Sequence, residues 1–443
     1  MGQLDGDGRS KEDVTSGSGP SVGSPTSDPV KYGELVVLGY NGFLPQGDKG
    51  RRRSKFPFFR REKPTGIKRS RHYVVDTPQH SKAVLDAQVH SISYTLSRNQ
   101  AVVVEYVPDE DTDMFQIGRS SEMPIDFVVM DTVPGDKSGS VDKTMQSTIS
   151  RFACRILVDR KPPHATRLFA AGFDSSRNIF LGEKATKWEE NGVIDGLTTN
   201  GVLLLHVKGN FVDGGAKPLP WREVSVNGGL YTMRESRSAP QKGKKMDMES
   251  CILEDGSMID LCGVTLLWRS AEGLEKSPSR RELETLLDLV NAGRPQCPVG
   301  LNTLVVGRKT NSLDREPYIY LKCGHVQGLH EWNPGQKKGT ESKERTCPIC
   351  MTIGPFVALT MAFESACYCD TGALTHAFAP QQAVGMFAFV PCGHMVTAKT
   401  ANYWANIPIP HGTKGYLAEC PFCATPLEGS TGFVRLIFQD WIS

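Results

Sequence analysis

The sequence has no long hydrophobic run: none of its apolar stretches approaches the ~20 residues that a membrane-spanning helix needs. Its first ten residues, MGQLDGDGRS, are polar and partly acidic, which argues against a secretory signal there. An excess of one charge is also missing, because 51 basic and 49 acidic residues leave a formal net charge of +2. Near neutrality argues against a general nucleic-acid or membrane-surface protein. We therefore expect a cytoplasmic chain with no membrane span and no nucleic-acid partner.

A disulfide framework is not expected either. Twelve cysteines in a 443-residue chain without a secretory signal predict reduced thiols that mostly bind metal. The length allows about two to three domains with a sizeable core. Most of the cysteines lie in the last third of the chain, so the metal chemistry is expected there.

One ligand pattern, Cys-Gly-His followed by Cys-Pro-x-Cys, occurs twice in this last third. The two halves of the pattern are separated by 21 residues in the first copy and by 25 in the second. The eight residues are Cys323, His325, Cys347 and Cys350, then Cys392, His394, Cys420 and Cys423. Three thiols and one imidazole form a tetrahedral zinc set, and four protein ligands leave no open position for catalysis. The pattern predicts two structural zinc ions, whereas the simpler alternative makes these thiols buried apolar residues.

The pattern leaves the pairing of ligands open. Each copy could hold its own ion, or ligands from the two copies could cross. Other cysteines and histidines could compete as ligands, but none has a counterpart in the other copy. They are Cys297, His330, Cys367, Cys369 and His411.

The first 272 residues have a different character. Residues 1–30 are rich in Gly, Ser, Pro and Asp and predict a disordered tail. Residues 31–272 contain short β-branched runs separated by Gly, Asn and Asp, and long amphipathic helices are hard to find. The clearest strands are 91–96 and 101–107. This pattern predicts a mainly β fold, a β-sandwich.

A basic segment, residues 49–61, interrupts this region with Arg and Lys between phenylalanines. Such a segment can bind nucleic acid or act as a nuclear signal. We favour a hairpin with solvated basic side chains and inward-facing phenylalanines, because the flanking stretches alternate like strands.

A single amphipathic helix is predicted after the β-rich region, within a linker at 273–296. Ser277 is the expected cap, Pro278 lies in the first turn, and Gly293 ends the helix. Its apolar face is Leu283, Leu286, Leu287 and Val290. The helix would pack between the β-rich domain and a zinc domain spanning 297–443.

Several polar motifs follow one another at the ends of the predicted strands. They are Gly118-Arg119, Ser150-Arg151, Thr199-Asn200 and the stretch 253–260. Their order resembles the forkhead-associated family, β-sandwiches that bind phosphothreonine peptides through loops at one end. The chemistry fits: Arg119 offers a bidentate guanidinium, Ser150 a hydroxyl, and Asn200 with Thr199 an amide for the peptide backbone. Read singly, these residues are an ion-pairing arginine and ordinary turn formers.

The resemblance has departures. The family usually has His two places after the arginine of its Ser-Arg motif, where this chain has Ala153. The spans from Arg119 to Ser150 and from Arg151 to Thr199 are longer than a minimal domain needs, and they contain strand-like pieces at 125–130 and 167–171. These spans predict a forkhead-associated β-sandwich with an inserted β wing.

Apolar residues stand beside the metal ligands. Ile349, Pro421 and Phe422 resemble residues of the RING family, whose metal loops bind ubiquitin-conjugating enzymes. The alternative is that they pack a small core. The ligand order is not that of an ordinary RING, so we expect an atypical, RING-like zinc domain.

The chain from about Lys31 to its end resembles the Pellino family. The stretches that carry this resemblance are Asp113–Ser121, Gln146–Cys154, Ala171–Phe180, Asp195–Gly201 and the two Cys-Gly-His repeats. The resemblance implies a RING-type E3 ubiquitin ligase of Toll-like receptor signalling in innate immunity. It also implies docking of phosphorylated Pelle/IRAK-type kinases through Arg119, Ser150, Arg151, Thr199 and Asn200, with a ubiquitin-conjugating enzyme and ubiquitin as further partners.

Two alternatives belong to other classes of protein. One is a phosphopeptide-binding scaffold with an inert zinc module. The other is a zinc-dependent nucleic-acid binder that uses the basic residues 51–61.

Overall fold

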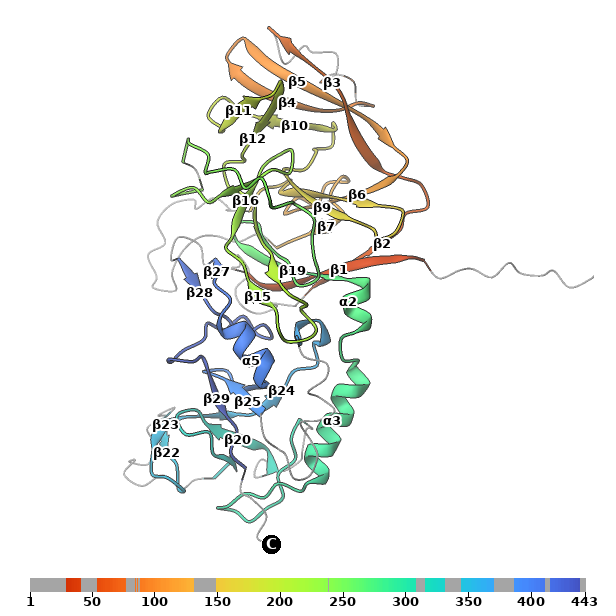
Figure 1. The fold of residues 1–443 in the computed structure, drawn as a ribbon. Helices are drawn as coiled ribbons and strands as arrows, with labels where there is room; N and C mark the ends of the chain where they lie inside the picture. Colours follow the sequence, from red (N-terminus) through yellow and green to blue (C-terminus); the bar gives the residue numbers. More distant parts are fainter. Residues whose placement is uncertain are drawn as a thin grey trace, which may run out of the picture.

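The computed structural model describes residues 29–40, 54–76, 84, 86, 88–130, 149–237, 239–307, 315–330, 344–369, 386–410 and 415–438. Apart from residues 29 and 30, the predicted tail lies outside these ranges. Strands dominate the described chain, with a β-rich upper part, a smaller lower part and two helices along one side (Figure 1). No helix in the described ranges is long and apolar enough to cross a membrane.

Two sheets packed face to face form the sandwich. The larger has the order β17-β16-β13-β18-β19-β1-β2 and the smaller the order β7-β6-β8-β9. Leu35, Phe58, Ile117 and Trp268 are among the side chains that fill the core between them, which confirms the predicted β-sandwich. The larger sheet contains β1 (Lys31–Tyr40), β2 (Lys55–Phe59), β13 (Leu203–Leu205), β16 (Arg222–Val224), β17 (Leu230–Thr232), β18 (Met258–Asp260) and β19 (Val264–Ser270). The smaller sheet contains β6 (Thr112–Gly118), β7 (Phe127–Val128), β8 (Cys154–Asp159) and β9 (Thr166–Ala170).

Strand β1 is buried on both faces, which explains its uninterrupted apolar run. Successive side chains of a strand point to opposite faces of its sheet. Leu35 and Val37 therefore point into the sandwich core, while Val36 and Leu38 join a second core on the other face of the same sheet.

The basic segment forms the expected hairpin strand where it is described. Strand β2 pairs antiparallel with β1. Phe58 is fully buried, Phe56 packs against the sandwich core, and Phe59 is exposed. The antiparallel pairing and the inward-facing Phe56 and Phe58 agree with the prediction, whereas Phe59 faces outward and the Arg61 guanidinium bonds to Asp126 and the Met114 carbonyl. Residues 49–53 lie outside the described part.

A second β lobe, the wing, sits on the sandwich. Its sheet has the order β10-β4-β5-β3, with the β11-β12 hairpin beside it. The strands are β3 (Gly66–Val75), β4 (His90–Ser97), β5 (Gln100–Asp109), β10 (Asn178–Leu181), β11 (Lys187–Glu190) and β12 (Val193–Gly196). They come from two insertions, one between β2 and β6 and one between β9 and β13.

The predicted wing is therefore present, but most of its strands are not those expected. The pieces at 125–130 and 167–171 belong to the sandwich, as β7 and β9. The strands at 91–96 and 101–107 belong to the wing, as β4 and β5. Alternating apolar residues predict a strand but not the sheet in which it pairs, and that is the physical reason for the error.

Two helices lead out of the sandwich, α2 (Ala271–Glu275) and α3 (Arg280–Ala292). The predicted helix is confirmed, but its cap is Ser279, which forms a reciprocal capping box with Glu282. Ser277, the expected cap, instead donates its hydroxyl to the Gly273 carbonyl. Leu283, Leu286 and Leu287 are buried in the second core, as predicted for the apolar face.

The C-terminal domain repeats one three-stranded unit. Strand β20 pairs with β21 and β23, and β25 pairs in the same way with β26 and β29. The first unit is β20 (Pro317–Tyr320), β21 (Val326–Gly328) and β23 (Ile353–Ala358), extended by β22 (Glu344–Thr346). The second is β25 (Met386–Phe389), β26 (His394–Thr397) and β29 (Phe433–Arg435), extended by β24 (Thr360–Met361). The second unit also carries helix α5 (Ala398–Ala405) and the hairpin β27 (Ile409–Pro410) and β28 (Tyr416–Leu417).

The two units are interlocked by the segments that leave them. Thr360, just after the first unit, pairs parallel with His394 of the second. Ile437, just after the second unit, forms a parallel bridge with His325 of the first. Each repeat therefore completes the sheet of the other, and neither can fold fully alone.

A shared apolar core joins the sandwich to the C-terminal domain. Val36 and Leu267 from the larger sheet lie in the same cluster as Trp404 and Ile409. Trp221 crosses the boundary and donates its indole N–H to the Pro408 carbonyl at 2.6 Å. The two parts in the upper and lower halves of Figure 1 therefore form one packed body.

We expect Trp221→Ala to uncouple the two parts. Truncating a buried aromatic side chain costs about 3–5 kcal/mol, and here the loss falls on the shared core. Differential scanning calorimetry should show one unfolding transition for the intact chain and two for Trp221→Ala. Trp188→Ala, in the wing strand β11, is the control and should keep a single transition. A single, equally shifted transition in both variants would contradict the role of Trp221 in coupling the two parts.

Candidate functional site

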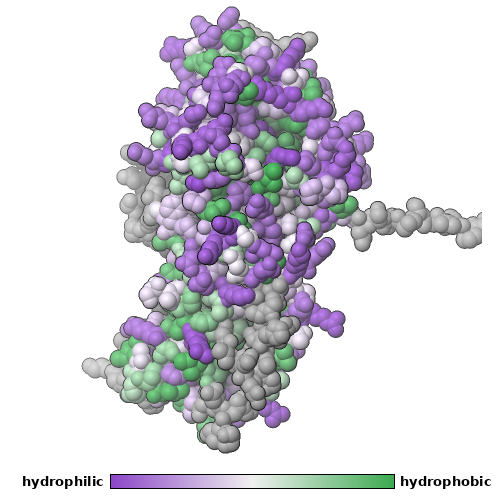
Figure 2. Space-filling model, viewed as in Figure 1, coloured by the Kyte–Doolittle hydropathy of each residue, from purple (hydrophilic) through white to green (hydrophobic). Residues whose placement is uncertain are grey.

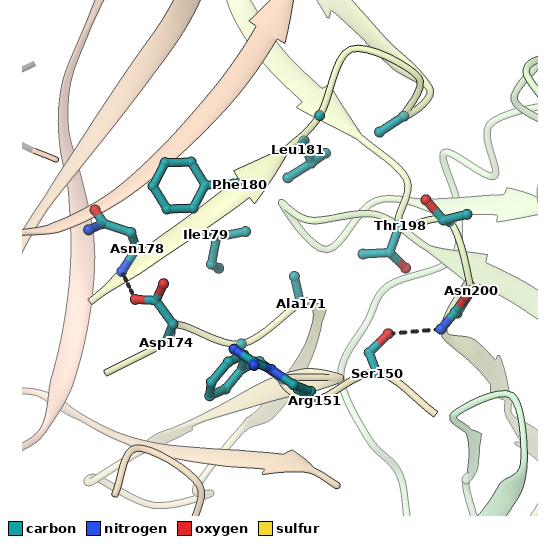
Figure 3. A pocket seen from close by; sticks show the side chains of 15 residues that line it. Ser150, Arg151, Ala171, Asp174, Asn178, Ile179, Phe180, Leu181, Thr198 and Asn200 are labelled. Carbon is teal, nitrogen blue, oxygen red and sulfur yellow. Dashed lines mark hydrogen bonds between the residues drawn. The ribbon is translucent and has the colours of Figure 1, made fainter. Parts of the chain in front are cut away.

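The predicted phosphopeptide residues lie on three loops at one end of the sandwich. The main-chain N–H of Arg119 donates to the Ser150 carbonyl at 3.2 Å, which joins the first two loops. The Asn200 side-chain amide donates to the Ser150 hydroxyl oxygen at 3.2 Å, which joins the third (Figure 3). Gly118 allows this approach, because a Cβ there would lie 1.9 Å from the Arg151 carbonyl oxygen.

These loops border a hollow of about 360 Å³, a size within the range of ligand sites. Ser150, Arg151, Thr199 and Asn200 line it together with wing residues (Figure 3). Arg119 does not line it: its guanidinium Nε donates to the Ile149 carbonyl at 2.8 Å, beside Ser150. Four of the five predicted residues thus share one hollow, and the fifth supports its rim.

The charge at the rim suits an anion. Arg151 is 58 % exposed, and its only close carboxylate among the described residues is Glu122, at 3.7 Å. Exposed ion pairs of this kind contribute at most about 1 kcal/mol, so the guanidinium can turn to another anion. Hydroxyl and amide groups from Ser150, Thr199 and Asn200 add donors beside it.

Ala153 occupies the position where the family usually has His. Its side chain is buried in the sandwich core, and its N–H donates to the Ile117 carbonyl at 2.9 Å. The chain therefore has no imidazole at this point of the rim.

Sequence reasoning missed Arg237, which supports the third loop from behind. Its guanidinium donates to the carbonyls of Asn200 and Gly201 at 3.3 and 3.4 Å and forms an ion pair with Asp260. Burial lowers the pKa of Arg237, but the Asp260 carboxylate outweighs this and raises it. The stretch ending at Asp260 was singled out in the sequence, but no local signal identifies its arginine partner.

The C-terminal domain places the eight predicted ligands in two clusters, one from each repeat. Within each cluster the ligand atoms lie within 4.8 Å of one another. One cluster is Cys323, His325, Cys347 and Cys350, and the other is Cys392, His394, Cys420 and Cys423. The ligands are therefore grouped sequentially and not crossed between the repeats.

The donor geometry fits a tetrahedral ion. Nδ1 of His325 lies 3.3 Å from Sγ of Cys323 and 3.6 Å from Sγ of Cys347. Nδ1 of His394 lies 3.4 and 3.7 Å from the corresponding sulfurs of Cys392 and Cys420. Zinc bonds of about 2.0–2.3 Å at tetrahedral angles separate nitrogen and sulfur ligands by about 3.5 Å. Both clusters thus match the spacing that a zinc ion requires.

One thiol of the first cluster is already acidic. Burial raises the pKa of Cys350, but hydrogen bonding with Thr352 and with the neighbouring thiols lowers it to about 6 overall. Metal binding requires thiolates, so this environment favours the ligand form.

The other candidate ligands lie elsewhere. Cys367 and Cys369 are fully buried, with their thiols directed at the Pro421 carbonyl and the Thr400 hydroxyl at 3.7 Å. His330 contacts Gln327 and Tyr320 instead of a thiol cluster. His411 lies outside the described residues.

Each Cys-Pro-x-Cys half folds into the same turn, the knuckle. In Cys347–Thr352 and Cys420–Thr425 the first cysteine N–H donates to the sixth residue's carbonyl at 2.9 Å. The fifth residue of each, Met351 or Ala424, has a positive φ.

A third knuckle, Cys297–Asn302, was not predicted. Its first N–H donates to the Asn302 carbonyl at 2.8 Å, and Leu301 has φ 55°. Gly300 stands where the other knuckles have their second cysteine, so this turn keeps the shape without the second thiol.

The knuckles differ in exposure. Ile349 and Met351 of the first repeat are 47 % and 59 % exposed, as a docking residue must be. Pro421 and Phe422 of the second repeat are buried, and the Phe422 ring lies against Tyr368 and His394. A conjugating enzyme cannot reach buried side chains, so the structure corrects the prediction for Pro421 and Phe422 and leaves it for Ile349.

The comparisons with known proteins agree over most of the chain. Residues 24–286 match the family model for the Pellino FHA domain, and residues 290–386 and 381–443 match that for the Pellino RING domain. Over 413 residues, 93 % of each chain, the sequence is 63 % identical to Protein pellino of Drosophila melanogaster. It is 54 % identical over 420 residues to E3 ubiquitin-protein ligase pellino homolog 2 of Homo sapiens, covering 94 % of this chain and 97 % of that one. With E3 ubiquitin-protein ligase pellino homolog 3 of Mus musculus it shares 51 % identity over 417 residues, 93 % and 90 % of the two chains. The chain belongs to the Pellino family.

Proposed function

We propose that this chain is a RING-type E3 ubiquitin ligase that docks phosphothreonine-bearing clients. The single observation that supports this best is the pairing, in one packed body, of the rim formed by Ser150, Arg151 and Asn200 with two four-ligand metal clusters. Its relatives in human and mouse bear the name E3 ubiquitin-protein ligase. The clients we propose are phosphorylated Pelle/IRAK-type kinases of Toll-like receptor signalling.

Client docking would depend on the rim. Arg119 and Arg151 supply guanidinium groups for the phosphate dianion, which can bond two of its oxygens at once. The Ser150 hydroxyl, which accepts from the Asn200 amide, adds a donor for the phosphate, and Thr199 and Asn200 can bond the peptide backbone. These five residues would recognise the client, and none of them would take part in bond making.

Transfer would depend on the zinc domain. Two zinc ions would hold the knuckles at Cys347 and Cys420 rigid, and Ile349 with Met351 would offer an exposed apolar contact to a ubiquitin-loaded conjugating enzyme. Such a ligase forms no covalent intermediate with ubiquitin, and it accelerates transfer by holding enzyme and client together. Tethering of this kind supplies an effective concentration on the order of mM.

We place the protein in the cytoplasm. Every cysteine in the structure is a free thiol. Reduced thiols and thiolate metal ligands suit a reducing compartment.

For the client site, Arg119→Ala should abolish binding of a phosphothreonine peptide, because the rim loses its anchored guanidinium. Arg98→Ala, an exposed arginine at the β4–β5 turn, should bind normally. Isothermal titration calorimetry measures the affinity of each variant, and of the intact chain, for the phosphorylated and the plain peptide. Equal affinity of the intact chain for the two peptides would refute the client site.

For the metal centres, variants that lack two ligands distinguish ligands grouped within each repeat from ligands crossed between the repeats. Cys323→Ala with Cys347→Ala leaves the second cluster complete, whereas Cys323→Ala with Cys420→Ala breaks both clusters. Native mass spectrometry in excess zinc should find two ions in the intact chain and more zinc in the first double variant than in the second. Cys297→Ala should keep both ions. The opposite ranking of the double variants would establish crossed ligands.

For transfer, Ile349→Ala should slow ubiquitin chain formation roughly tenfold or more, as expected for a central interface anchor worth about 2 kcal/mol. Leu417→Ala removes an apolar side chain of similar exposure on β28 and should have little effect. Chain formation with a panel of purified conjugating enzymes is the measurement, with zinc content checked in each variant. If the intact chain makes no ubiquitin chains with any of them, the protein is a phosphopeptide-binding scaffold.

A further inference from the structure

The hollow beside the phosphopeptide rim has a second wall, which the proposed function does not use. Ser150, Thr198 and Asn200 of the sandwich form one side, and the wing strand β10 forms the other (Figure 3). The two walls come from different β lobes, and the hollow between them opens next to the phosphate donors.

Strand β10 is an edge strand of the wing sheet. It pairs parallel with β4, and the Ser91 N–H donates to the Arg177 carbonyl at 3.0 Å. In a parallel pair, alternate residues bond the neighbouring strand. Ile179 and Leu181 therefore face β4, and the main-chain groups of Asn178 and Phe180 face the hollow.

Of these two residues, only Asn178 already has hydrogen-bond partners for its outward main-chain groups. The Asn178 carbonyl accepts from the Asp174 N–H at 3.0 Å, and the Asn178 N–H donates to Asp174 Oδ1 at 2.9 Å. Phe180 has no such partner on this side among the described residues. Its main-chain N–H and C=O are open to an extended peptide, and the residue as a whole is 55 % exposed.

We propose that the client segment next to the phosphothreonine is extended and pairs with β10 through the Phe180 main chain. This inference rests on the proposed client site. An unpaired strand edge binds an extended peptide by main-chain hydrogen bonds, and pockets for alternate side chains add selectivity. The wing is thus a second recognition element, and the preferred ligand is a phosphothreonine with an extended flank instead of an isolated phosphothreonine.

The experiment compares two substitutions of one residue. Phe180→Pro removes the open N–H while leaving the bonds to β4, because proline is tolerated where an edge strand's N–H faces outward. Phe180→Ala removes the ring and keeps the N–H. The probe is the tightest-binding peptide that the intact chain selects from a phosphothreonine peptide library with randomised flanks. We expect Phe180→Pro to bind it roughly two- to tenfold more weakly than Phe180→Ala, as for one lost hydrogen bond.

A blocked tripeptide, Ala-phosphothreonine-Ala, separates the two claims. It is too short to pair with β10, so Phe180→Pro and the intact chain should bind it equally. Loss of all phosphothreonine binding in the intact chain would overturn the client site itself. Equal binding of the long peptide by Phe180→Pro and Phe180→Ala would overturn only the strand pairing.

A measurement on the intact chain guards against misfolding of Phe180→Pro. Peptides carrying a single backbone N-methyl group at each flanking position should include at least one that binds several-fold more weakly. If N-methylation weakens binding at none of the flanking positions, the strand pairing is refuted.

Discussion

The buried guanidinium of Arg269 depends on both halves of the molecule. This residue is the last but one of strand β19, and its side chain is fully buried. It pairs with Asp255 and donates to the carbonyls of Gly273 and Ala366 and to the Ser277 hydroxyl. A buried charge is tolerated only when it is paired and hydrogen-bonded. Since Ala366 belongs to the C-terminal domain, the sandwich alone cannot satisfy this arginine, and the two domains depend on each other.

The interlocked zinc repeats extend this dependence. Structural zinc would add to the stability of this domain on the order of 10–16 kcal/mol per ion. Each cluster takes its ligands from one repeat, but the chain then crosses to the sheet of the other. Gly324 and Gly393 allow this crossing, because a Cβ there would meet the carbonyl oxygens of Arg435 and Ala358 at 2.0 and 2.4 Å. The glycine of each Cys-Gly-His motif is therefore required by the partner repeat as well as by its own turn.

The sequence predicted best what is local and chemically specific. The eight metal ligands, the helix face at Leu283, Leu286 and Leu287 and the existence of a sandwich follow from spacing and periodicity. Where long-range pairing decides, the sequence left the answer open or predicted it wrongly. The grouping of ligands, the strands of the wing and the burial of Phe422 depend on which segments meet in space. Arg237 was missed because it acts through Asp260, a partner 23 residues away in the sequence. The third knuckle, at Cys297, was missed because it lacks the second cysteine.

The fixed arrangement of the domains limits how a client can be modified. Strand β10, at the phosphopeptide rim, and strand β22, next to the exposed knuckle, lie at opposite ends of the molecule (Figure 1). The surface between them is largely hydrophilic over the upper part and more apolar over the lower part (Figure 2). The shared core leaves little freedom between the domains, so the proposed phosphothreonine site and the proposed conjugating-enzyme contact are held apart. The ligase would therefore select clients by the distance between the two sites as well as by the phosphorylated sequence, which suits folded clients with an extended phosphorylated tail.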